Sequence, residues 1–134
     1  PIAYVDGRPM LDGGIVDSIP VLRAISQGYK RNVVVLTRNR GYRKSESDIR
    51  VPRFIYTRYP RLRVVLSRRC LVYNKQLEMI ERMEDEGSII VIRPEAPVRV
   101  NRIEKDLTKL QALYEEGLAC AEKVMTPYLS AKAN

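Results

Sequence analysis

Apolar stretches broken by glycine and charged residues predict three short elements at the start of the chain. Asp6-Gly7 lies between apolar residues, and this dipeptide supplies the positive φ angles that a two-residue hairpin turn needs. Residues 18–25 begin with a capping serine and carry apolar side chains at helical spacing, so they predict a short helix. The β-branched run over residues 32–37 is typical of a strand covered on both faces. Strand, helix and strand together favour a parallel βαβ unit over residues 1–37.

The remainder of the chain predicts two long helices with a strand between them. An apolar stripe indicates a helix over about residues 60–86, which Gly87 ends. Residues 88–92 predict a second buried strand, and helical periodicity resumes over about residues 106–129. Residues 38–59 are basic and aperiodic, so we expect a surface loop there.

Composition narrows the class of protein. The chain is 45% hydrophobic and 30% charged, and it lacks a stretch of roughly 20 apolar residues, so we expect a soluble globular domain. Cys70 and Cys120 are too far apart for metal-ligand spacing and form no disulfide framework, which favours a cytoplasmic protein. Histidine, the commonest general base and metal ligand, does not occur. We expect neither a metal nor a cofactor.

The net charge of +8 is concentrated in one part of the chain. Residues 38–69 contain ten arginines and one lysine but only two acidic residues, a local charge of +9. Tyrosines are interleaved with these arginines, a pattern that phosphate-binding surfaces use. The candidates for an anionic-surface site are Arg38, Arg40, Arg43, Lys44, Arg61 and Arg63. Two interpretations stay open: the arginines pair with carboxylates of the same domain, or they bind lipid head groups, with nucleic acid less favoured.

Candidate chemistry is concentrated in Asp12-Gly13-Gly14. Asp12 is predicted to lie where a strand ends and a helix follows, and open α/β sheets gather reacting groups at such strand ends. Gly13 and Gly14 allow positive φ angles and leave room for another group to approach the carboxylate. The arrangement suits a general base, but the tripeptide is also an ordinary turn.

Two other acidic positions are interpreted as structural. Asp17 precedes the predicted helix start, so we expect it to cap that helix. Glu84, Asp85 and Glu86 lie near the end of the first long helix, and we expect them to form a solvated face.

The stretch from Leu11 to Val21 closely resembles the Asp-Gly-Gly block of patatin-like phospholipases, and the likeness to the bacterial branch extends over essentially all of the chain. The resemblance implies an α/β fold: the C-terminal half of a three-layer domain with a mainly parallel sheet and flanking helices. Residues 1–37, with the Asp loop and the βαβ unit, the basic loop 38–59 and the helix-strand-helix segment 60–134 would then be parts of one hydrolase domain.

The resemblance also implies a Ser-Asp dyad, in which a serine attacks an ester carbonyl and Asp12 takes its proton, with Gly13 and Gly14 supporting the loop. The family's Gly-x-Ser-x-Gly motif is absent from this sequence. We therefore expect a portion of a phospholipase or carboxylester hydrolase that is inactive without the missing N-terminal half of the domain. Peripheral membrane contact and a homodimer or swapped assembly are further expectations. The alternative is a stand-alone basic module that binds anionic membrane or nucleic acid.

Overall fold

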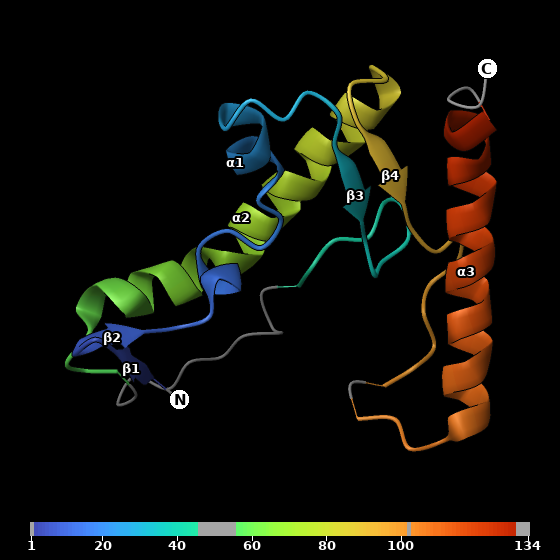
Figure 1. Ribbon diagram of the computed structural model, residues 1–134. Coiled ribbons are helices and arrows are strands. Elements are labelled where there is room, and N and C mark those ends of the chain that lie inside the picture. Colours follow the sequence, from blue (N-terminus) through green and yellow to red (C-terminus); the bar gives the residue numbers. More distant parts are fainter. Residues whose placement is uncertain (1, 46–55, 102, 131–134) are drawn as a thin grey trace. The chain divides into compact units, whose positions relative to one another are not determined.

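The computed structural model describes residues 2–45, 56–101 and 103–130 (Figure 1). Residues 46–55 of the predicted basic loop therefore lie outside the described residues. The chain forms two compact units, and each unit combines segments that are distant in the sequence. The first unit comprises Pro1–Gln27 and Arg43–Ile80, and the second comprises Gly28–Tyr42 and Glu81–Asn134.

The first unit opens with a β-hairpin, which confirms the prediction from Asp6-Gly7. Strand β1 (Ala3–Val5) pairs antiparallel with β2 (Arg8–Met10). The two turn residues have φ angles of 49° and 74°, the left-handed values that a tight two-residue turn requires.

The helix predicted over residues 18–25 is shorter than expected. A 3-10 turn, η1 (Gly13–Ile15), is followed by α1 (Val21–Ser26), which has no side-chain cap. The hydroxyl of Ser18 donates instead to the carbonyl oxygen of Gly14 at 2.7 Å, so this serine stabilises the preceding turn and does not cap the helix.

Helix α2 (Pro60–Asp85) confirms the first predicted long helix. Its buried side chains, Leu66, Cys70, Leu77 and Ile80, follow helical spacing and lie on one face. The helix ends where Gly87 takes a φ of 69° and its N–H donates to the carbonyl of Glu84 at 2.9 Å. The part of α2 up to Ile80 belongs to the first unit, and the last turn belongs to the second.

A parallel strand pair lies in the second unit. Strand β3 (Val33–Val35) pairs with β4 (Ile90–Ile92), and the N–H of Leu36 continues the ladder to the carbonyl of Ile92 at 2.8 Å. Val34 is buried, but Val33 is 46% and Val35 is 69% exposed. The prediction that residues 32–37 are covered on both faces is therefore wrong within this chain, because Val33 and Val35 stay largely exposed on one face of the strand.

Helix α3 (Leu107–Ser130) confirms the second predicted long helix and lies alongside β4 (Figure 1). Asp106 caps it, since the carboxylate accepts from the N–H of Thr108 at 3.0 Å. Lys123 Nζ lies 2.5 Å from Glu95 Oε1, which links the helix to the segment after β4. None of the described helices combines the length and the apolar character needed to cross a membrane. The three-layer arrangement remains an expectation.

Candidate functional site

Asp12 lies in a hydrogen-bonded turn between β2 and α1. Its Oδ1 accepts a hydrogen bond from the N–H of Gly14 at 2.8 Å, and its carbonyl oxygen accepts from the N–H of Ile15 at 3.1 Å. The side chain is exposed. Within the described part of the chain, the Gly14 N–H is the one hydrogen-bond donor to this carboxylate. The backbone therefore orients one oxygen and leaves the group accessible.

The two glycines after Asp12 have different roles. Neither uses the positive φ that glycine allows, because the 3-10 turn needs only ordinary helical angles. A Cβ on Gly14 would lie 3.3 Å from Asp12 Oδ1, whereas one on Gly13 would meet nothing within 4 Å. Gly14 is thus the residue whose small size allows the carboxylate to approach the backbone.

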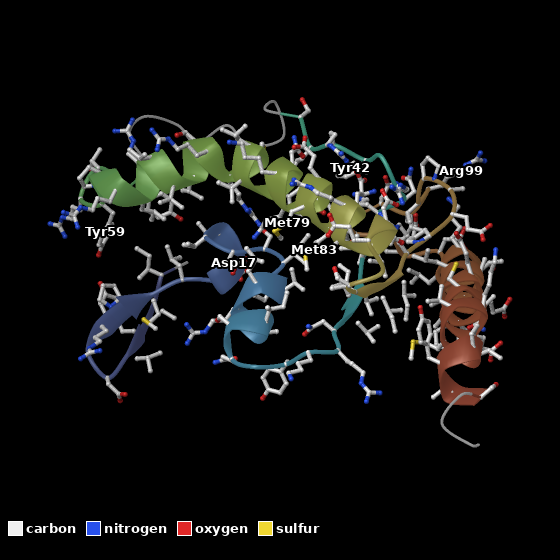
Figure 2. All side chains as sticks on the ribbon, turned by 90° about the horizontal axis from the view of Figure 1, so that it is seen from above. Asp17, Tyr42, Tyr59, Met79, Met83 and Arg99 are labelled. Carbon is white, nitrogen blue, oxygen red and sulfur yellow. The ribbon has the colours of Figure 1, made fainter. Side chains whose placement is uncertain are left out.

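Asp17 has a different partner from the one predicted. Its Oδ1 accepts from Nε2 of Gln76 on α2 at 2.5 Å, and α1 begins after Pro20 without a side-chain cap. Asp17, labelled in Figure 2, therefore fixes the loop that follows Asp12 to the long helix of the same unit. The predicted capping role is wrong because the helix begins too far along the chain for this carboxylate to reach its first N–H groups.

The basic candidates before residue 46 lie in two different units. Arg38 packs over the ring of Tyr42 at 5.1 Å in the second unit. In the first unit, Arg43 Nε lies 3.7 Å from Glu78 Oε1, and Lys44 Nζ lies 5.7 Å from the centre of the Tyr73 ring. Arg38 and Arg40 thus belong to the second unit, and Arg43 and Lys44 belong to the first.

Arg40 belongs to a charge cluster that the sequence analysis missed. It lies 2.7 Å from Asp85 Oδ2 and 3.3 Å from Glu84 Oε2, and Glu84 also pairs with Arg93. Asp85 and Glu86 are exposed, as predicted for a solvated face, but Glu84 is half-buried. The unpredicted feature is the pairing with Arg40, which arises because the loop before residue 43 folds back on the end of α2. The helical periodicity of the sequence does not indicate that Arg40 pairs with these carboxylates.

The ion pairs and the burial of Arg93 shift the pKa values of the residues in this cluster. Hydrogen bonds from Arg40 lower the pKa of Asp85, and the same bonds raise the pKa of Arg40. Burial lowers the pKa of Arg93, and the positive charge of Arg40 lowers it further. The cluster is an internal ion-pair network, and this agrees with the interpretation that part of the basic segment pairs with the chain's own carboxylates.

Arg61 and Arg63 lie in the first turn of α2. Arg61 is exposed and Arg63 is half-buried. They belong to the first unit, whereas Arg38 and Arg40 belong to the second. The six predicted basic residues therefore do not form a single cluster within either unit.

A cavity of about 240 Å³ opens in the second unit at the carboxyl ends of β3 and β4. Its wall is mainly apolar and includes Leu36, Ile92 and Leu113, with Glu116 and Cys120 contributed by α3. Open α/β sheets place ligands at this end of their strands. No local pattern predicts this cavity, because it depends on how α3 packs. Among the described residues, no group of three or more acidic or cysteine side chains could hold a metal ion.

The model of one protein family, described as a domain of unknown function (DUF6363), matches residues 59–131. This is more than half of the chain. The chain belongs to the DUF6363 family. The match includes α2, β4 and α3, and Asp12 lies outside it. No curated protein and no solved structure matches the chain.

The expected membership of the patatin-like family is wrong, because the match is to DUF6363 and no patatin-like model matches. The resemblance rested on short blocks such as Asp12-Gly13-Gly14. Their glycines meet turn requirements that recur in many α/β proteins, so such blocks do not identify a family. With that family removed, the role of Asp12 depends on the geometry of its own turn.

Proposed function

We propose that this chain supplies Asp12 as the general base of a serine acyl hydrolase whose serine lies on another segment. The observation that carries the proposal is the 2.8 Å hydrogen bond from the Gly14 N–H to Oδ1 of an exposed carboxylate. A carboxylate held in this way can accept the proton of a hydroxyl nucleophile as that hydroxyl attacks an ester carbonyl. The lack of histidine in this chain agrees with direct transfer of the proton to Asp12.

The exposed apolar side chains of β3 support the involvement of a further segment. Parallel sheets are normally covered on both faces, yet Val33 and Val35 of β3 present apolar side chains to solvent. We expect another part of the same domain to cover β3, and a second copy in a dimer or swapped assembly is the alternative partner. The isolated chain would then be inactive.

The proposed substrates are carboxylic esters, including lipid esters. A cytoplasmic location fits the two free cysteines, Cys70 and Cys120. Peripheral contact with a membrane would bring the chain to lipid substrates. The DUF6363 match is compatible with this proposal but adds nothing to it, because that family is described as having an unknown function.

Ester hydrolysis by the full-length protein that carries this chain tests the proposal. Asp12→Asn is expected to lower kcat by roughly 100-fold to 10,000-fold, since the amide cannot take the proton. Asp6→Asn is the matched control, because it removes another exposed carboxylate of the same unit, and asparagine tolerates the positive φ of 49° at this turn position. Equal activity of wild type and Asp12→Asn would disprove the role of Asp12, and hydrolysis by the isolated chain would disprove the need for a second segment.

A further inference from the structure

The first four turns of α2 have a second organised face, opposite to the buried one. Residues spaced at i, i+3, i+4 and i+7 lie on one side of a helix. The residues at this spacing that are exposed form the outer face of α2: Arg61, Val64, Arg68, Leu71, Val72 and Lys75. Figure 2 shows the helix along its length from Tyr59 at its N-terminal end. Leu66 and Cys70 lie on the opposite, buried side.

Apolar side chains are unusually accessible on the outer face. Val64 is 49%, Leu71 is 55% and Val72 is 40% exposed. Single exposed apolar residues are common on protein surfaces, but these three lie within about two helical turns of one another. They form an apolar strip that basic residues flank along the helix.

Charge on this part of α2 is of one sign. Residues 61–75 contain five basic residues and no acidic residue, and the first carboxylate of the helix is Glu78. Within the described part of the chain, no carboxylate forms an ion pair with Arg61, Arg68 or Lys75.

This arrangement opposes the helix macrodipole. Helix stability favours acidic side chains in the first turn and basic ones in the last, but the first turn of α2 has no acidic residue, and Glu84 and Asp85 lie in its last turn. Arg61 and Arg63, which lie in the first turn, therefore interact unfavourably with the helix dipole. A negatively charged partner would remove this unfavourable interaction.

We propose that the outer face of α2 docks in the plane of an anionic membrane surface. The basic residues would contact lipid phosphates, and Val64, Leu71 and Val72 would enter the boundary between head groups and acyl chains. A nucleic-acid backbone offers the same charges but no apolar layer, so it leaves the strip unexplained. The face lies inside the matched DUF6363 region, and its role does not depend on Asp12.

Sedimentation of the full chain with vesicles tests the charge requirement. The chain is expected to bind phosphatidylcholine vesicles that contain phosphatidylglycerol and not vesicles of phosphatidylcholine alone. The double variant Arg68→Gln/Lys75→Gln should bind roughly 30-fold more weakly, since each basic residue contributes about a fivefold gain in affinity near an anionic surface. Lys30→Gln/Arg31→Gln makes the same charge change in an exposed segment outside α2 and should bind like the wild type. Equal losses in both double variants would overturn the proposal.

A tryptophan reporter tests the apolar contact, because the chain contains no tryptophan of its own. The emission of Leu71→Trp should shift to shorter wavelength when anionic vesicles are added. Tyr114→Trp, at an exposed position of α3, should show no shift. Absence of binding to anionic vesicles, or binding with no shift at residue 71, would overturn the proposal. Salt-sensitive binding to single-stranded or duplex DNA without vesicle binding would assign the face to nucleic acid instead.

Discussion

Gln76 of α2 donates a 2.5 Å hydrogen bond to the carboxylate of Asp17 and thereby connects the helix to the loop that follows Asp12. The two residues are distant in the sequence, and both belong to the first unit. The position of the Asp12 turn therefore depends on α2 as well as on its own backbone. A hydrogen bond to a charged group contributes more to stability than one between neutral groups.

Asp17→Ala is expected to lower the free energy of unfolding by about 1 kcal/mol, because it removes the charged acceptor of Gln76. Glu86→Ala, which removes an exposed carboxylate near the end of α2, should change it by less than about 0.5 kcal/mol. Urea unfolding followed by circular dichroism gives both values. Equal effects would show that the bond to Gln76 does not stabilise the loop.

The two glycines of the Asp12 turn should respond differently to alanine. Gly13→Ala is expected to raise the free energy of unfolding by about 0.4–1 kcal/mol, because its backbone angles suit alanine and the unfolded chain loses freedom. Gly14→Ala should gain less or lose stability, since its Cβ would lie 3.3 Å from Asp12 Oδ1. Chemical denaturation of both variants provides the comparison. A larger gain at Gly14 would contradict the described turn.

The two faces of α2 should differ strongly in their effect on stability. Ile80 is fully buried, so Ile80→Ala should cost about 2–5 kcal/mol through lost burial and a residual cavity. Leu71→Ala on the outer face should cost less than about 0.5 kcal/mol, because Leu71 is already exposed to water. Thermal and urea unfolding both report this difference. A cost at Leu71 comparable to that at Ile80 would mean that the outer face is packed against protein.

Acid should weaken the cluster around Asp85. Arg40 lowers the pKa of Asp85 in the folded state, while Glu81 opposes this shift, and Glu84 and Arg93 are the other charged groups of the network. A lowered pKa gives stabilisation that is fully present above the ordinary carboxyl pKa and is lost as pH falls through the folded value. Asp85→Asn should therefore be less stable than wild type at neutral pH, and the difference should disappear as the pH falls below the ordinary carboxyl pKa and through the lowered pKa of folded Asp85.

Unfolding measured across this pH range tests the Asp85 prediction, with Glu86→Gln as a control outside the network. The control should show no comparable pH-dependent difference from wild type. A difference between Asp85→Asn and wild type that persists unchanged in acid would show that the carboxylate does not act through its charge.

Local patterns were sufficient for the elements that form without distant partners. The hairpin at Asp6-Gly7 follows from residues that tolerate positive φ, and helices α2 and α3 follow from apolar periodicity ended by Gly87 or begun by Asp106. These signals act over a few residues, so they can be identified in the sequence alone. The concentration of basic residues in the first four turns of α2 is equally visible in the sequence.

Contacts between residues from distant parts of the chain are seen only in the tertiary structure. The pairing of β3 with β4, the bond between Asp17 and Gln76, and the contact of Arg40 with Asp85 each join residues that no local pattern connects. The outward direction of Val64, Leu71 and Val72 was decided in the same way, because periodicity places residues on a face but does not say which face is buried. The sequence determined helices and turns through short-range backbone preferences, and packing determined which side chains meet and which stay available for a partner.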